Sequence, residues 1–436
     1  MKSSIPILLL LTATASAEPR KLTLASAIDL TMQKSPDLAQ AQASVDAAKA
    51  KTQQSSRKML PSLNVQAVGN YYTEPYTLAF GSLGNFTLHK QATSLTNVQL
   101  LQPLTGLAYL SELVGSGDHD EKAAAADYDR ARLDAAYATA AAYVKLLEAR
   151  ASADVTHRAV ADIQSELEQA QKQRAADTAT NIDVLRLQAA KASADQAAVR
   201  ADTQVQQALA GLVVQIGLHD GEAIEIEDDL PPQPPALALS LEQAIARGVA
   251  ARPELRQARE KIASAGDIET SKKEEYLPNI NATATWTHTT GLEPFQPANE
   301  EYVGLSVNWK VWDWGSIWGE VKEAKANHSR ALLAADALTD HVRLDIHQKW
   351  LDAKAGFDNL ASAQTQLQSA EEAYRLQHVK YVNGAATTTD VIDSETDVAR
   401  ARLQSSLARY DYYLSLVALA RSVGDLPNPA ASTPAH

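Results

Sequence analysis

The sequence predicts a mainly α-helical protein that also carries a few β-strands of the kind that cross membranes. Three observations predict this fold class. The chain repeats itself, long stretches contain neither glycine nor proline, and short segments alternate apolar and polar residues. They predict two copies of one unit, each ordered as helix, strand, strand and long helical hairpin.

The repeat appears as a constant offset between the two halves of the chain. At an offset of 217 residues, Leu60-Pro61 meets Leu277-Pro278 without a gap. Further on the offset is 207, where TNIDVLRLQ from Thr180 meets TTTDVIDSE from Thr387. Self-similarity at a fixed spacing indicates a duplicated structural unit. We therefore expect a first repeat at 18–217, an acidic proline-rich linker at 218–238 and a second repeat at 239–424.

The two ends of the chain are expected to lie outside this framework. Residues 1–17 combine Lys2, an apolar run and the small residues Ala15-Ser16-Ala17, which is the pattern of a secretory signal peptide. The segment 425–436, after Gly424, has the composition of a disordered tail. The chain contains no cysteine, which excludes disulfide bonds and a lipid anchor on an N-terminal cysteine.

Helices are predicted to occupy most of each repeat. The first begins near Thr23 or Ser240, which can act as caps, and ends at the Leu-Pro pair. Between Asp118 and Ala210 the chain contains no glycine or proline. A helix over about 107–173 would be on the order of 100 Å long. Its residues at alternating four- and three-residue steps predict a coiled-coil seam, formed by Leu133, Tyr137, Ala140, Val144, Leu147 and Ala151.

Four segments are predicted to be membrane strands, at about 62–72, 94–104, 279–288 and 302–312. In the fourth, Val303 and Leu305 alternate with Gly304 and Ser306, as expected for a strand between lipid and water. An ordinary sheet with one solvated face would give the same alternation in any single strand. Four strands cannot close a membrane barrel, so the membrane interpretation requires an oligomer.

Aromatic residues gather in and beside these strands. Membrane proteins place tryptophan and tyrosine where the bilayer meets water. We therefore predict that the following residues anchor the strands at the membrane interface: Trp286, Trp309, Trp312, Trp314, Trp318, Tyr71 and Tyr72.

Several classes of function are excluded by the sequence. A net charge of −13 without clustered Lys and Arg does not suit nucleic-acid binding. The sequence shows no phosphate-binding glycine loop, no nucleophile elbow and no His-Glu-x-x-His motif, so we predict no enzyme, no cofactor and no firm metal site. A soluble periplasmic coiled-coil adaptor or scaffold remains an alternative, because its long hairpins would give the same pattern.

The signal peptide, the duplicated helix-Leu-Pro-strand arrangement, the segments QPLTG and KVWDWG, and the turn YVNGAATTTDVIDSE resemble the TolC family of outer-membrane efflux channels. The resemblance covers nearly the whole mature chain. It implies a homotrimer with a twelve-stranded β-barrel. This barrel would lie, like a porin, in the outer membrane of a Gram-negative bacterium, and would continue as an α-helical coiled-coil barrel across the periplasm. It also implies an exit duct that serves a periplasmic adaptor and an inner-membrane pump of RND, ABC or MFS type.

The resemblance further implies a gate at the periplasmic tip of the helices. The family pattern of Tyr, Gly and an Asp-x-x-Asp pair falls on Tyr381, Gly384, Asp390 and Asp393, and Asp183 is the first-repeat equivalent of Asp390. Rings of these carboxylates would favour cations and could bind a polyvalent one. A purely structural role as helix caps would use the same residues. The position of a family arginine is Ala386 here, which argues against a closed state held by an arginine lock in this chain.

Overall fold

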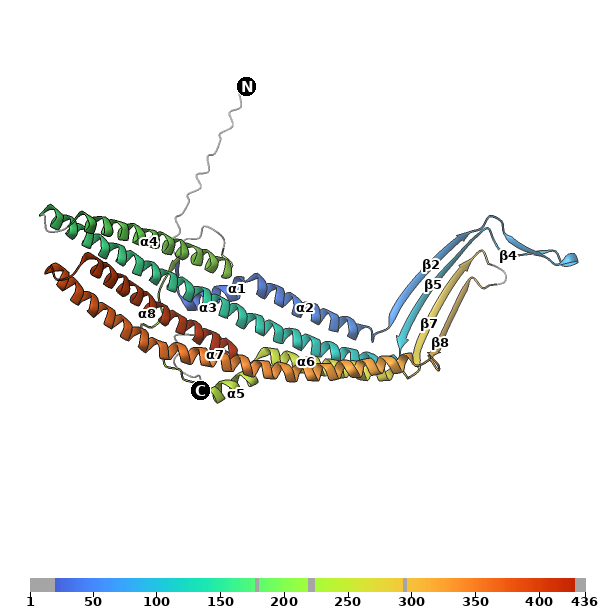
Figure 1. The fold of residues 1–436 in the computed structure, drawn as a ribbon. Helices are drawn as coiled ribbons and strands as arrows, with labels where there is room; N and C mark the ends of the chain where they lie inside the picture. The colour runs from blue at the N-terminus through green and yellow to red at the C-terminus, as the bar shows by residue number, and fades with distance from the viewer. Residues whose placement is uncertain (1–19, 177–179, 219–223, 293–295, 428–436) are drawn as a thin grey trace, which may run out of the picture. The chain divides into compact units, whose positions relative to one another are not determined.

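The computed structural model describes residues 20–176, 180–218, 224–292 and 296–427 (Figure 1). The predicted signal peptide, five residues of the linker and most of the predicted tail lie outside these ranges. The chain divides into two compact units. We call the described parts of 1–39, 131–252 and 342–436 the helical unit, and 40–130 with 253–341 the sheet unit.

Each repeat folds into the same succession of elements. The first contains β1 (Arg20–Leu22), α1 (Leu24–Lys34), α2 (Pro36–Arg57), β2 (Ser62–Tyr71), β3 (Tyr76–Ala79), a 3-10 turn η1 (Gly81–Leu83), β4 (Asn85–His89), β5 (Ala92–Pro103), α3 (Gly106–Ala175) and α4 (Asn181–Gln215). After β6 (Ile224–Ile226), the second contains α5 (Leu241–Ala251), α6 (Pro253–Glu274), β7 (Asn279–Thr290), β8 (Asn299–Asn308), α7 (Ser316–Val382) and α8 (Thr388–Ser422). The predicted fold class, mainly helical with one small antiparallel sheet in a duplicated chain, is confirmed.

The duplication extends to single residues. α1 and α2 have the bounds of α5 and α6 shifted by 217, whereas α4 has those of α8 shifted by 207. The strand pairs share one register, since Asn64 pairs with Gln99 and their equivalents Asn281 and Ser306 also pair. The change of offset therefore arises entirely between the two strands of each repeat. There the first repeat carries the extra hairpin β3–β4, which lies between the predicted strands at 62–72 and 94–104 and was not predicted.

The first helix of each repeat is shorter than predicted. Thr23 and Ser240 cap α1 and α5 through complete capping boxes, as expected. Each helix, however, ends two residues before a proline, and a second helix begins at Pro36 or Pro253. The residue before a proline disfavours the α conformation, and proline suits the first turn of a helix. The preference that ends a helix before the Leu-Pro pair therefore also ends α1 before Pro36 and α5 before Pro253.

The four long strands form one antiparallel sheet in the order β2-β5-β7-β8 (Figure 1). β8 ends at Asn308, earlier than the predicted boundary near 312, so Trp309 and Val311 follow the strand. Continuing the register would pair Trp309 with Pro278, which has no amide hydrogen to donate to the ladder. The Trp309 indole instead donates to the carbonyl oxygen of Tyr276, at 3.1 Å.

The register also assigns the two faces of the sheet, including that of β5, whose alternation is weak in the sequence. Side chains of neighbouring residues point to opposite faces. One row across the sheet is apolar and consists of Leu63, Leu100, Ala284 and Val303. The next row, on the opposite face, is largely polar and consists of Asn64, Gln99, Thr285 and Tyr302. The apolar face is exposed, and Val303 has 83% of its surface accessible.

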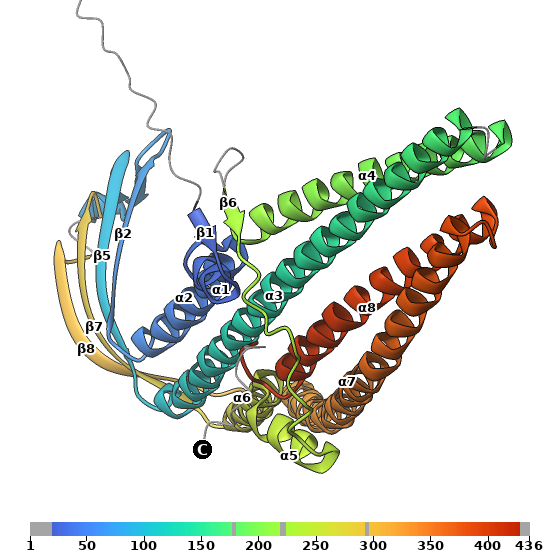
Figure 2. The same cartoon turned by 90° about the vertical axis from the view of Figure 1, so that its left-hand side faces the viewer.

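The helical unit holds the main hydrophobic core. In Figure 2, α4 runs back along α3 and α8 runs back along α7. The middle of the predicted seam is buried there, with Ala140, Val144 and Leu147 at most 3% exposed, whereas its other members are only partly buried. The linker after β6 is fixed to α8, because the hydroxyl of Tyr413 donates to the carbonyl oxygen of Pro231 and that of Tyr412 to Pro235. None of the described helices is long and apolar enough to cross a membrane.

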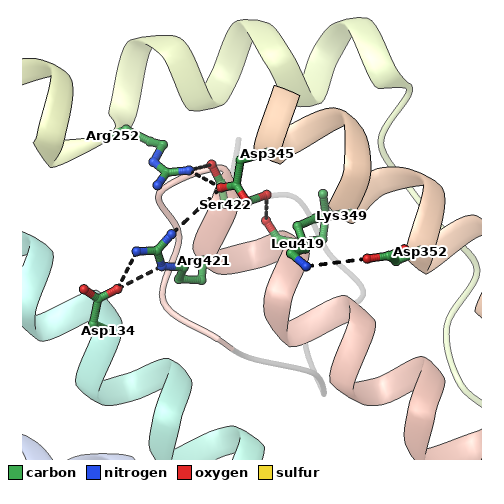
Figure 3. A network of polar contacts seen from close by, with 8 residues as sticks. All are labelled: Asp134, Arg252, Asp345, Lys349, Asp352, Leu419, Arg421 and Ser422. Carbon is green, nitrogen blue, oxygen red and sulfur yellow. Dashed lines mark hydrogen bonds and ion pairs between the residues drawn. The ribbon is translucent and has the colours of Figure 1, made fainter. Parts of the chain in front are cut away.

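An ionic network around the buried Arg252 lies where α5 ends (Figure 3). The side chain of Arg252 is 7% exposed and pairs with Asp345 of α7. Its guanidinium group also donates to the carbonyl oxygen of Ser422 in α8. Arg421 of α8 pairs with Asp134 of α3, at 2.7 Å. A buried charge requires such partners, so the network fixes four helices to one another.

Replacing Gly248 with Ala should destabilise the protein by about 1–3 kcal/mol, because a Cβ atom there would overpack a buried contact. The added methyl would meet the side chain of Ile346 and the carbonyl oxygen of Ser422, the latter at 3.1 Å. Gly211, inside α4, has open space where a Cβ atom would lie, because apart from the nearby backbone of α4 itself no atom of the described residues comes within 4 Å. Gly211→Ala should therefore stabilise the protein by up to about 1 kcal/mol. Denaturant unfolding of both variants in detergent measures the change in the free energy of unfolding, which should have opposite signs. Equal changes in the two variants would contradict this packing.

Candidate functional site

The turn between α7 and α8 is built by a glycine in the left-handed region. Gly384 has a φ of +74°, which L side chains rarely adopt. The amide of Gly384 donates to the carbonyl oxygen of Tyr381, and the amide of Ala385 donates to that of Lys380. These bonds end α7 in the manner of a Schellman motif. Tyr381 is buried at this tip, and its hydroxyl lies 3.5 Å from Oε1 of Gln173 in α3.

Asp390 lies in the first turn of α8 and forms a capping box with Thr387. Its Oδ2 accepts hydrogen bonds from the amide of Thr387, at 2.8 Å, and from the hydroxyl of Thr387, at 2.7 Å. These bonds hold the pKa of Asp390 below its ordinary value, since they favour the ionised carboxylate. Asp393, one turn later, is exposed. Asp390 therefore presents a negative charge at the tip at neutral pH.

The tip between α3 and α4 repeats this arrangement and contacts the other tip. Thr180 donates to Oδ2 of Asp183 from its hydroxyl, at 2.6 Å, and this bond is the main cause of a lowered Asp183 pKa. Oδ1 of Asp183 accepts a further bond from the hydroxyl of Thr388, at 3.0 Å. Arg186 donates to the hydroxyl oxygen of Thr389, at 2.9 Å. Two side-chain bonds thus join the start of α4 to the start of α8.

The two side-chain bonds between the tips were not predicted from the sequence. Arg186 lies at the position equivalent to Asp393 at the offset of 207, so the two repeats carry opposite charges there. The alignment of TNIDVLRLQ with TTTDVIDSE contains that signal. Position 386 holds alanine, yet an arginine tie between the two hairpins exists and comes from α4. The roles of Tyr381, Gly384, Asp183, Asp390 and Asp393 in gating stay predictions.

The predicted interface aromatics lie toward the two ends of the sheet. Tyr71 pairs with Ala92, at the end where the strands meet their loops. The exposed Trp309, Trp312 and Trp314 follow β8 and lie at the opposite end, and Trp318 lies in the first turn of α7. At about 3.3 Å per residue, β2 separates these ends by about 30 Å, which is close to the thickness of the hydrocarbon core. Trp286 lies within β7, on the apolar face.

The model of the family described as outer membrane efflux protein matches the chain twice, at 27–218 and at 244–425. The chain belongs to this family. The two matches begin 217 residues apart and end 207 residues apart, which are the two offsets of the internal repeat. Members of the outer membrane efflux protein family are transport proteins and not enzymes. The predicted family, location in the outer membrane with extension into the periplasm, and lack of enzymatic activity are thereby confirmed.

A known protein of this family resembles the chain over much of its length. The chain is 23% identical over 299 residues to the outer membrane efflux protein BepC of Brucella suis biovar 1 (strain 1330). That match covers 66% of this chain and 62% of the relative, which is less than two thirds of the relative's length.

Two solved structures share the fold of this outer membrane efflux protein. The outer-membrane channel OprN is 18% identical with a TM-score of 0.79, covering 92% of this chain and 89% of OprN. The outer membrane protein VceC of Vibrio cholerae is 18% identical with a TM-score of 0.77, covering 92% and 96% of the two chains. Because the identities are low, these likenesses establish the fold alone.

Replacing Thr388 with Val should loosen the tip, because it removes the hydroxyl that donates to Asp183 while it keeps the shape of the side chain. We expect amide hydrogen exchange at the start of α8 to rise on the order of fivefold, the effect of a hydrogen bond worth about 1 kcal/mol. Thr396→Val is the matched control, since the Thr396 hydroxyl donates only to the carbonyl of Ile392 within α8. Equal exchange in the two variants would mean that the bond between the tips contributes nothing.

Proposed function

We propose that the chain is the outer-membrane exit duct of a tripartite efflux or type I secretion system. In this proposal it acts as a passive homotrimeric channel that is gated at its helical tip. It offers a path and a gate, and a partner supplies the energy. Membership of the outer membrane efflux family favours this function over the alternative of a soluble periplasmic adaptor.

The observation that carries the proposal is the open sheet. Within the described residues, β2 and β8 each pair with one neighbouring strand, which leaves the outer edge of each without a strand partner. In a bilayer every backbone polar group must be bonded within the protein. Joining β2 of one copy to β8 of the next would satisfy both edges. Three copies would then close a barrel of twelve strands, which no single copy can form.

The faces of the sheet support a water-filled pore. The apolar face, represented by Leu63 and Val303, would contact outer-membrane lipid, and the polar face, represented by Asn64 and Thr285, would line the lumen. The exposed aromatics Tyr71 and Trp309, near opposite ends of the strands, would then lie at the two surfaces of the bilayer. Tyr72, Trp286, Trp312, Trp314 and Trp318 belong to the same proposed set of anchors.

The tips supply the proposed gate. In a trimer, Asp390 and Asp393 would each form a ring of three carboxylates, which would favour cations and would bind a polyvalent cation. Gly384 would allow the tight turn and Tyr381 would pack behind it. The bonds from Thr388 to Asp183 and from Arg186 to Thr389 would hold the two hairpins of one copy together in the closed state.

The proposed partners follow from the need for energy. No nucleotide-binding motif is present in the sequence, so transport would be driven through a periplasmic adaptor protein by an inner-membrane pump of RND, ABC or MFS type. The helical hairpin tips would be the natural surface for this docking, because they lie at the end of the longest helices.

The proposal is tested by recording the purified, detergent-extracted protein in a planar bilayer. Trimers on native mass spectrometry, together with long-lived cation-selective openings, are the expected result. Addition of a trivalent cation on the side of the helical tips should block these openings. Protein that stays soluble without detergent and is silent in the bilayer would rule out the channel.

The double variant Asp390→Asn and Asp393→Asn should lower cation selectivity on the order of twofold or more and should remove the block by a trivalent cation. Trimer formation should persist, since the asparagine at 390 can still accept the capping bonds from Thr387. Asp397→Asn is the control, because Asp397 is an exposed carboxylate of the same helix that pairs with Arg400. Selectivity that is unchanged in the double variant would remove both residues from the pore.

A further inference from the structure

Glu395 of α8 is a buried carboxyl group that lacks a donor. Its side chain is 3% exposed, and among the described residues neither of its carboxylate oxygens has a hydrogen-bond partner. Glu166 of α3 is 6% exposed, and its Oε2 also lacks a partner. A buried ionised carboxylate without a donor is costly, whereas a protonated one is not. The geometry therefore favours a proton on Glu395.

The surroundings of Glu395 are more acidic than basic. Glu166 is partly satisfied, since its Oε1 lies 3.2 Å from Nε2 of His378 and accepts from the hydroxyl of Tyr374 at 3.3 Å. The guanidinium group of Arg402 is divided between Asp162, at 3.4 Å, and Glu371, at 3.3 Å. The titratable and charged groups around the site are Asp162 and Glu166 from α3, Glu371, Tyr374 and His378 from α7, and Arg400 and Arg402 from α8.

Asp162 offers Glu395 a bond only when one of the two carboxyls carries a proton. Both are acceptors when ionised, and a protonated carboxyl can donate to an ionised one. Burial, and next the negative charge of Asp162, raise the pKa of Glu395 to about 7. The nearby guanidinium group of Arg402 opposes this shift only in part. A proton on Glu395 is therefore gained or lost near neutral pH.

Glu395 also borders a groove that could admit water. The groove has a volume of about 490 Å³ and lies between α3, α4 and α8. Apolar side chains such as Ile163 and Leu403 line most of it. The lining from α4 is small and uncharged, and consists of Ala190, Ser193, Ala194 and Ala197. Ionisation of Glu395 would draw water into this groove, because most of the lining is apolar and cannot solvate the charge.

The position of Glu395 connects it to the tip. It lies seven residues after Thr388, which at 1.5 Å per residue places it about 10 Å along α8 from the bond to Asp183. Glu395 and the bonds between the tips therefore lie at the same end of α8. A change in how α8 packs against α3 at Glu395 would act on these bonds.

We propose that Glu395 is a proton-binding site that controls how firmly α8 packs against α3, so that its ionisation releases the start of α8 and the tip. The proposal concerns packing within one chain. Only its consequence for conductance rests on the proposed channel function.

The direction in which pH changes the packing of α8 follows from the raised pKa of Glu395. A carboxyl whose pKa is raised in the packed state stabilises that state fully below its ordinary value of 4.5. The stabilisation is lost as the pH rises through about 7. The equilibrium between packed and released α8 should therefore shift toward release by up to about tenfold per pH unit in that window.

The experiment is amide hydrogen exchange of the start of α8 in the full-length, detergent-extracted protein between pH 5 and 8, corrected for the intrinsic pH dependence of exchange. In the unmodified chain we expect protection to fall as the pH rises. Glu395→Gln should keep the protection seen at low pH throughout. Glu372→Gln is the control, because Glu372 is an exposed carboxylate of α7 that pairs with Arg375, and it should leave the profile unchanged.

A second variant keeps the proposal falsifiable if Glu395→Gln does not fold. Glu166→Gln removes a neighbouring negative charge and should move the midpoint of the transition to lower pH. An unchanged midpoint in Glu166→Gln, or the same pH profile in Glu395→Gln and the unmodified chain, overturns the proposal. Conductance recorded over the same pH range separates the two proposals: an exchange transition without any channel activity would reject the channel and retain the proton site.

Discussion

The backbone hydrogen bonding of the four-stranded sheet constrains the rest of the molecule. Among the described strands, β5 and β7 have neighbours on both sides, whereas β2 and β8 each have one. An outer-membrane protein cannot leave such edges to lipid, which is why we propose closure with other copies. A β2-to-β8 seam would require the two edge strands to match in length, and both are ten residues long. The shared register of the two strand pairs gives them equivalent ends.

The sequence predicted most of the fold because its signals are local. The alternation in β8, the seam through Val144 and the caps at Thr23 and Ser240 depend on neighbouring residues alone. Errors arose where a partner elsewhere in the chain decides the outcome. β8 stops at Asn308 because its continuation would meet Pro278, the residue directly before β7. The hairpin β3–β4 was missed because its strands are short and face solvent.

The tip residues were found by resemblance, yet their partners could not be. Asp183 and Asp390 are visible in the sequence as repeated capping residues. Nothing local indicates that Thr388 donates to Asp183, which is 205 residues away. Glu395 is equally hidden, because a glutamate in a helix is ordinarily solvated, and its burial depends on how α3 and α8 pack. Sequence patterns identify faces and caps, whereas buried polar contacts require the tertiary structure.

The residue-for-residue match between the repeats has an evolutionary consequence. A ring made from separate copies of one unit must be identical at every position, but fusion of two units in one chain allows equivalent positions to diverge. The bounds of most elements have been kept while the residues have diverged: one repeat alone carries β3–β4, one tip alone carries the glycine at 384, and Arg186 stands opposite in charge to Asp393. Each half is thus an internal reference for the other, and differences between them indicate where selection has acted on one half alone.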